Sequence, residues 1–184
     1  MKLSNQQSLP VPQATAWEAL NDVAILQSCI PGCESLQPLG DDRYEVIVQA
    51  AIGPVKARFK GQLALSDFHP PHSYRLAFEG QGGAAGHGKG SAGVRLVAAG
   101  PDETVLHYDA TAMVGGKIAQ IGQRLVDMAA QRMAAEFFSK FEAQLRARHA
   151  PEDTAAEPAH EETGRLRRWL NRMTGSRSES EPVS

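Results

Sequence analysis

The stretch RYEVIVQAAIGPVKARFKGQLAL, residues 43–65, contains two runs of alternating side chains joined by the pair Gly53-Pro54. Apolar or small side chains recur at every second position, namely Tyr44, Val46, Val48, Ala50 and Ile52, then Val55, Ala57, Phe59, Gly61, Leu63 and Leu65. Polar and charged side chains fill many of the positions between them. A period of two is typical of a β-strand with one buried face. The stretch therefore predicts two antiparallel strands joined by a tight turn.

The same alternation continues in three segments further along the chain: residues 74–80, 86–98 and 104–114. On the N-terminal side, residues 2–12 predict a short strand that breaks at its prolines, because proline removes a backbone donor. Two short helices are expected between that strand and the quoted stretch, over residues 13–22 and 23–30.

A long helix is expected from Lys117 to about Ala147, after the sheet ends at Gly115-Gly116. Its apolar side chains form one stripe: Ile118, Ile121, Leu125, Ala129, Met133, Phe137, Phe141 and Leu145. Steps of four residues rotate such a stripe slowly around the helix, which suits a helix that crosses a twisted sheet. The predicted fold class is α+β: a curved antiparallel sheet wrapped around a long C-terminal helix, with two short helices after the first strand.

Small residues are frequent on the side of the sheet that should face the helix, as at Gly88, Gly90, Ala110 and Ala112; Gly86 falls on the same face. Glycine inside a strand often marks the close approach of a ligand or of another backbone. We therefore predict an apolar cavity between sheet and helix, although the glycines could instead serve bends or a loop. The expected ligand-binding residues are Val48, Ala57, Phe59, Phe78, Gly88, Gly90, Ala110, Ala112, Ile121 and Leu125.

Composition narrows the function classes. The chain has 184 residues, 42% of them hydrophobic, and a net charge of −2, which gives no sign of nucleic-acid binding. No secretory leader and no apolar run of about 20 residues are present, so we expect a cytoplasmic protein without a membrane-spanning helix. The sequence also lacks the common hydrolase, zinc-protease and phosphate-loop motifs.

Three pairs of side chains are candidates for a chemical centre. Cys29 and Cys33 are spaced C-x₃-C without a second pair, so a structural turn is favoured over a metal or redox site, and no metal ligand is assigned. His107 and Asp109 should face away from the cavity as a solvated pair. Arg132 and Glu136 should form a surface salt bridge on the long helix, or Arg132 could meet a polar head group. No catalytic residue is assigned.

The last part of the chain differs in composition from the first 147 residues. Residues 148–162 are rich in proline, alanine and acid and predict a disordered linker, and residues 176–184 predict a disordered end. Between them, residues 163–175 predict a short amphipathic helix with an apolar stripe and a basic face. Its expected membrane-binding residues are Arg165, Leu166, Arg167, Arg168, Trp169, Leu170, Arg172 and Met173. Such a helix suits an anionic membrane surface, or docking on its own domain or on a partner protein.

The segments CIPGCESL, GPVKARFKG, GKGSAG, VGGKIAQIGQRLVDMAA and FFSKF occur in this order in residues 1–147. In these segments the chain resembles the carbon monoxide dehydrogenase G-subunit family, a branch of the START-like, Bet v 1-like (SRPBCC) superfamily. The resemblance implies a helix-grip fold with a hydrophobic cavity. It also implies an accessory protein that binds a quinone-like lipid and brings a molybdenum hydroxylase of the carbon monoxide or xanthine dehydrogenase type to the inner face of the cytoplasmic membrane. No covalent cofactor is implied.

Two alternatives remain open at this point. One is an enzyme of the same superfamily, cyclase-like or hydrolase-like, which would need a polar catalytic group inside the cavity. The inferred inward faces offer chiefly Tyr44, Tyr74 and Tyr108. The other is an assembly factor whose tail docks on the hydroxylase and whose cavity has no function.

Overall fold

The computed structural model describes residues 1–149. Residues 150–184 include nearly all of the expected linker, the basic helix and the end of the chain, and those predictions lie outside the described residues. The elements, in chain order, are β1 (Lys2–Leu9), α1 (Gln13–Leu20), α2 (Val23–Cys29), β2 (Cys33–Gly40), β3 (Arg43–Ile52), β4 (Val55–His69), β5 (Ser73–Gln81), the 3₁₀ turn η1 (Gly83–Ala85), β6 (His87–Gly100), β7 (Glu103–Gly115), α3 (Lys117–Gln120) and α4 (Gln123–His149).

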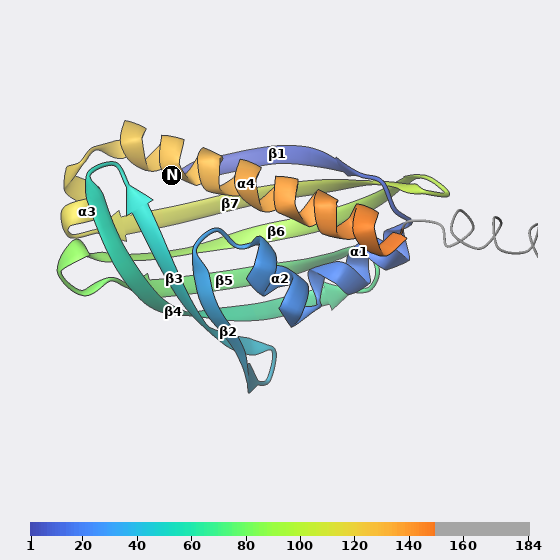
Figure 1. Cartoon of the computed structure of the whole chain (residues 1–184), viewed down its shortest axis with the longest axis horizontal. Helices are drawn as coiled ribbons and strands as arrows, with labels where there is room; N and C mark the ends of the chain where they lie inside the picture. The colour runs from blue at the N-terminus through green and yellow to red at the C-terminus, as the bar shows by residue number, and fades with distance from the viewer. Residues whose placement is uncertain (150–184) are drawn as a thin grey trace, which may run out of the picture. The chain divides into compact units, whose positions relative to one another are not determined.

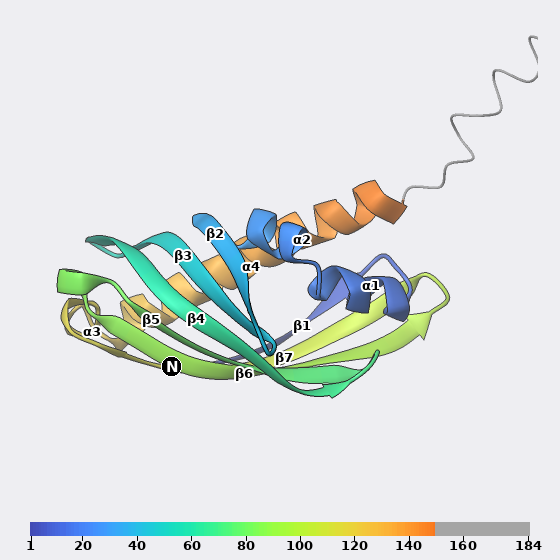
Figure 2. The ribbon, with the colours of Figure 1, turned by 90° about the horizontal axis from the view of Figure 1, so that it is seen from below.

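Within residues 1–149, seven strands form one antiparallel sheet in the order β1-β7-β6-β5-β4-β3-β2. Only β1 is out of sequence order, because it pairs with β7 at one edge. The sheet curves strongly, and α4 crosses its concave side together with α1 and α2 (Figures 1 and 2). The predicted α+β class, with a curved sheet around a long helix, is confirmed.

The structure corrects three details of the predicted elements. Strand β2 was not predicted, because its sequence CESLQPLG lacks a clear alternation. Its pairing with β3 is also irregular, with a register shift near each end. The long helix is not continuous from Lys117: it breaks after α3, at Gly122, whose φ of +98° is left-handed. Gly86 precedes β6 instead of lying within it.

The fully buried core lies under the C-terminal half of α4. Phe138, Phe141 and Leu145 from that half pack against buried side chains of the strands and of the two short helices. The other members of this cluster are Leu9, Val11, Ala16, Ala19, Leu20, Ile25, Cys29, Tyr74, Leu96 and Leu106. Trp17 packs edge-on against Tyr74, and Tyr108 stacks on Phe138. These contacts fix α1, α2 and the end of α4 on the sheet.

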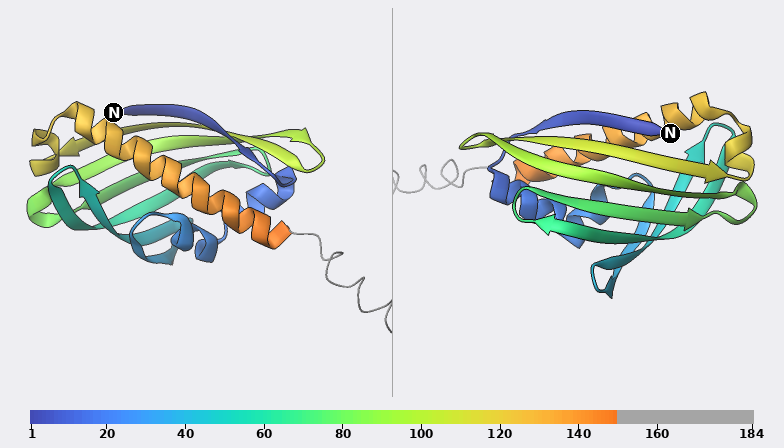
Figure 3. Two further views of the ribbon diagram at one scale, coloured as in Figure 1. Left: turned by 45° about the horizontal axis from the view of Figure 1, so that its top comes forward. Right: turned by 180° about the vertical axis from the view of Figure 1, so that it is seen from behind.

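The N-terminal half of α4 is packed much less closely. Leu125 is 41% exposed and Met128 is 56% exposed, while Met133 is half-buried. Figure 2 shows that α4 starts close to the sheet beside α3 and stands farthest from it at its C-terminal end, near α1 and α2, and the left view of Figure 3 shows how it crosses the strands. Val126 is the one buried residue of this half, and an unfilled space lies between the sheet, Ile118 of α3 and Met133 near the middle of α4.

The turn between α2 and β2 depends on Gly32. Its φ is +70°, its carbonyl accepts a hydrogen bond from the backbone N–H of Gln49 at 2.9 Å, and a Cβ at this position would lie 2.0 Å from the Gln49 carbonyl oxygen. Glycine is required here for two independent reasons, the left-handed backbone and the close approach of β3.

We expect Gly32→Ala to lower the free energy of unfolding by about 3 kcal/mol or more, since the added methyl collides with backbone. Gly40→Ala is the matched control, because Gly40 has a φ of +87° but nothing within 4 Å of its Cβ position. It should cost about 1–2 kcal/mol, the cost of the left-handed conformation alone. Urea unfolding measures both. Equal losses would show that the contact with β3 does not hold this turn.

Candidate functional site

An apolar cavity of about 290 Å³ lies between the sheet and α4, at the end away from the fully buried core. It is open to solvent on one side. Its walls come from the inward faces of β3 to β7, from the residue after α2, and from the two C-terminal helices: Ile30, Val46, Val48, Ala50, Ile52, Phe59, Gly61, Leu63, Phe78, Gly80, Gly88, Val114, Ile118 and Met133. Of these, only Ile118 is fully buried. The cavity is thus a partly open space with hydrocarbon walls.

A single row of residues across the sheet forms the floor of this cavity. The pairing of neighbouring strands aligns Val46 with Gly61, Gly61 with Gly80, Gly80 with Gly88, and Gly88 with Val114. Three adjacent strands therefore contribute only a hydrogen atom toward α4 at this level. Side chains of ordinary size would fill the space here, so the glycines create the cavity.

The glycines near the cavity are of two kinds. At Gly61 a Cβ would lie 2.1 Å from the backbone oxygen of Glu79, so the strand itself requires glycine. At Gly90 a Cβ would lie 2.2 Å from the backbone oxygen of Thr111 and 2.6 Å from the ring of Phe78, so the strand again requires glycine, which also leaves room for that ring. At Gly80 and Gly88 the nearest atoms are 3.6 Å or more away, so a larger side chain would fit. The backbone does not require glycine at these two positions, and the absence of a side chain there leaves the cavity empty.

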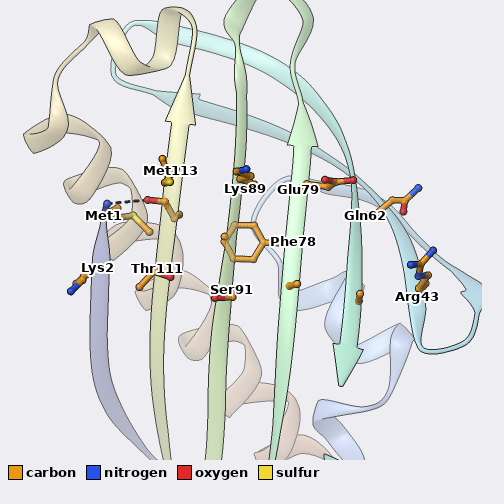
Figure 4. A pocket seen from close by; sticks show the side chains of 14 residues that line it. Met1, Lys2, Arg43, Gln62, Phe78, Glu79, Lys89, Ser91, Thr111 and Met113 are labelled. Atoms are coloured by element: carbon orange, nitrogen blue, oxygen red, sulfur yellow. Dashed lines mark hydrogen bonds between the residues drawn. The ribbon is translucent and has the colours of Figure 1, made fainter. Parts of the chain in front are cut away.

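A larger hollow of about 670 Å³ lies on the opposite, outer face of the sheet. Charged and polar side chains such as Lys2, Arg43, Gln62, Glu79 and Lys89 surround small ones in this hollow (Figure 4). The right view of Figure 3 shows that no helix among residues 1–149 covers this face. The wall of the inner cavity is almost entirely apolar, so the inner cavity is the better candidate site for a hydrophobic ligand.

The structure places four of the ten predicted ligand-binding residues in the cavity wall, namely Val48, Phe59, Phe78 and Gly88. Gly90 and Ala112 pair with each other one row further along, where the Phe78 ring covers Gly90.

The other four predicted residues do not line the cavity. Ala57 pairs with Ala50, which does line it, and Ala110 lies between Leu3 and Ala92. Ile121 and Leu125 lie beside the tip of the β3–β4 hairpin, their Cδ1 atoms 3.5 and 3.6 Å from the Cβ position of Gly53.

Alternation could have found most of the residues that were missed. Val46, Ala50, Gly61, Gly80 and Val114 all lie on the predicted inward faces of their strands. Met133 and Ile118 belong to the predicted apolar stripe of the long helix, whereas Ile30 carries no such signal, because its place depends on how α2 packs on the sheet. The sequence thus indicated the face of the sheet that lines the cavity but not the level along the strands at which the cavity lies.

Two of the three inward-facing tyrosines, Tyr74 and Tyr108, belong to the packed core, and Tyr44 pairs with the wall residue Leu63 without lining the cavity itself. Burial raises the pKa of Tyr74 well above its usual range, and Tyr74 stacks on Phe68 and meets Trp17. Burial likewise raises the pKa of Tyr108, which stacks on Phe138. Neither hydroxyl is suited to exchange protons near neutral pH.

The two cysteines form no disulfide. Burial is the main cause that raises the pKa of both thiols, and the Cys33 thiol contacts the carbonyl of Ser35 at 3.4 Å. Both are therefore poor nucleophiles at neutral pH. Within residues 1–149, no group of three or more His, Cys, Asp or Glu side chains is arranged to hold a metal ion.

The remaining polar candidates lie away from the cavity. His107 and Asp109 alternate with the inward residues of β7 and face outward, where Asp109 lies opposite Gly93. The predicted salt bridge between Arg132 and Glu136 is wrong: Glu136 pairs instead with Lys140, at 2.9 Å. Arg132 and Lys140 each lie four residues from Glu136. Lys140 is the better partner, because an i,i+4 pair on a helix is more stable when the glutamate precedes the basic residue.

The family model for the carbon monoxide dehydrogenase G subunit (CoxG) matches residues 6–146, which span nearly the whole described domain. The chain belongs to this family. The match confirms the resemblance noted in the sequence. The comparison with curated proteins found no match.

Solved structures agree with this assignment. A conserved protein from Geobacillus kaustophilus is 31% identical, with a TM-score of 0.76, and the match covers 80% of this chain and 96% of that one. A START superfamily protein from Mycobacterium smegmatis is 15% identical, with a TM-score of 0.62, over 79% and 97% of the two chains. An aromatase/cyclase from a Streptomyces strain is 14% identical, with a TM-score of 0.58, over 82% and 96%. The last two show the fold alone, which is START-like.

None of the helices within residues 1–149 is long and apolar enough to cross a membrane. The family is named for a component of an enzyme, which agrees with an accessory role.

Proposed function

We propose that this protein is a non-enzymatic accessory protein that binds a hydrophobic, quinone-like molecule in the inner cavity. The observation that supports this most directly is the contrast between the two ends of α4. One end covers a filled core, and the other stands over a cavity whose apolar walls are only half-buried. Apolar surface left in contact with water is unfavourable by roughly 25 cal/mol per Å². A hydrophobic ligand would cover that surface.

The cavity walls argue against chemistry at this site. A general acid or base has to lie within hydrogen-bond reach of the reacting atoms. Glu79 is the one charged residue that borders the cavity among those described, and its side chain alternates to the outer face beside Gln62 and Lys89 (Figure 4). The wall therefore suits a protein that holds a molecule without converting it.

The partner in this proposal is a molybdenum hydroxylase of the carbon monoxide or xanthine dehydrogenase type. Membership of the CoxG family supports this choice, because the family is named for association with such an enzyme. The quinone-like class of the ligand follows from the same family argument and from the apolar walls. The protein would carry such a molecule between membrane and enzyme, with no covalent cofactor of its own.

The tail supplies the membrane contact in this proposal. Residues 163–175 combine Trp169 with Arg165, Arg167, Arg168 and Arg172. Each basic residue near an anionic surface contributes roughly 1 kcal/mol, and tryptophan favours the interface. The tail would hold the protein reversibly at the inner face of the cytoplasmic membrane. Docking of the tail on the hydroxylase itself is the competing arrangement.

Gly80→Ile should abolish capture of quinone from vesicles while the domain stays folded. The added side chain enters the cavity, and only backbone atoms 3.8 and 3.9 Å away lie near its Cβ. A β-branched residue is also better suited than glycine to a strand, so the free energy of unfolding should stay equal or rise. The measurement is mass spectrometry of full-length protein separated from anionic vesicles that contain ubiquinone.

The matched control for this variant is Gly100→Ile at the far end of β6, where nothing lies within 4 Å of the Cβ position. It should capture quinone as the wild type does. Undiminished capture by Gly80→Ile would move the ligand to another site.

Deletion of residues 164–175 should abolish flotation with anionic vesicles and leave the domain folded, because the basic and apolar side chains of the tail are removed together. Raising the salt concentration should weaken flotation of the full chain, since exposed charges are screened. Flotation that survives the deletion would contradict the tether. Salt-insensitive capture of the hydroxylase by the tail alone would favour docking on the enzyme.

A further inference from the structure

We infer that the inner cavity takes up the hydrocarbon chain of an amphiphilic ligand and leaves its polar head group outside. This inference rests on the proposed function, because it assumes that the cavity binds a hydrophobic molecule. It adds the orientation of that molecule and the part of it that is recognised. The orientation depends on whether the cavity wall contains hydrogen-bond donors for the oxygen atoms of the ligand's head group.

No side chain that points into the cavity from the described residues can donate a hydrogen bond. The wall consists of aliphatic side chains, two phenylalanine rings, one methionine and three glycines, with the Glu79 side chain on the outer face. A quinone carbonyl or a hydroxyl placed here would give up its hydrogen bonds to water and find no replacement. Unpaired polar groups in apolar surroundings are strongly disfavoured.

The backbone groups of the glycine row are also unable to replace water. The glycine row belongs to interior strands, and each of its members pairs with a residue on both sides. In an antiparallel sheet these pairings use the N–H and C=O groups within the plane of the sheet. The N–H of Ile30, at the end of α2, donates to the carbonyl of Leu26 at 2.9 Å. A ligand above the glycines therefore meets Cα atoms and not free donors.

Four hydroxyl groups on the concave side need to be placed. Tyr44 pairs with the wall residue Leu63 but is not itself among the residues that line the cavity, and the other three lie at the other end of the domain. Tyr74 is fully packed between Trp17 and Phe68, and Tyr108 lies against Phe138. The hydroxyl of Thr104 is buried and donates to the carbonyl of Val11 at 2.8 Å. The filled core separates these three groups from the cavity, so they are unavailable to a ligand there.

The size of the cavity agrees with this orientation. Sites that enclose a drug-sized ligand measure about 300–1,000 Å³, and this one, at about 290 Å³, is at the lower limit and open on one side. It suits part of a long-chain molecule better than a whole one. A head group left outside stays within reach of a second protein, which is what delivery of a redox-active ring to a hydroxylase would require.

A series of 2-methyl-1,4-naphthoquinones with 3-alkyl chains of zero to ten carbons tests the orientation on the full-length protein. Calorimetric titration below the micelle concentration should show affinity that rises about fourfold for each methylene entering the cavity and then levels off once it is full. Alkanols with the same chains should show the same dependence on chain length. Gly80→Ile should remove the dependence, and Gly100→Ile should keep it.

The possible outcomes separate the orientation from the proposed function. Binding that depends on chain length and is insensitive to the head group supports the orientation. Equal affinity for the chainless and the ten-carbon naphthoquinone, lost in Gly80→Ile, would overturn the orientation and leave the cavity as the ligand site. Failure of every compound to bind, or binding that Gly80→Ile leaves unchanged, would overturn the proposed function itself.

Discussion

The packing of Phe141 and Leu145 against the sheet is the interaction on which the rest of the structure depends. These side chains are almost fully buried, and together with Phe138 they hold only the C-terminal half of α4. The N-terminal half buries only Val126 and is separated from α3 by the left-handed Gly122. A helix held at one end over a curved sheet encloses a filled core there and an unfilled space at the other end.

The three glycines in the floor of the cavity then determine how that space is shaped. Gly61 is fixed by the backbone of the neighbouring strand, and Gly90, one row away, is fixed by the backbone of β7 and by the Phe78 ring. Gly80 and Gly88 have no such constraint, although each glycine inside a strand lowers stability. Residues that lower stability without a packing reason are expected where a protein keeps room for something else. The site is therefore a space left by glycines in the strands and not a cluster of reactive side chains.

The sequence predicts the sheet well and the helices less well, for a physical reason. Alternation over residues 43–65 places Val48, Phe59 and their neighbours on the correct face, because the period of two leaves one choice of face. It does not say at which level along the strands the cavity lies, so Ala57 and Ala110 were predicted along with residues that do line it. The break at Gly122 was missed because the apolar stripe continues across it in the sequence, and this shifted Ile121 and Leu125 out of the cavity. Ile30 joins the wall only through tertiary packing.

The most direct test of the account is to locate a bound ligand by nuclear Overhauser effects between a long-chain alkyl naphthoquinone and the methyl groups of the full-length protein. The account predicts contacts to Val46, Val48, Val114 and Ile118, which surround the cavity, and none to Leu9, Leu96 and Leu145 in the filled core. Contacts to Met113 and Ala77 in the outer hollow, with none to the cavity methyls, would contradict it.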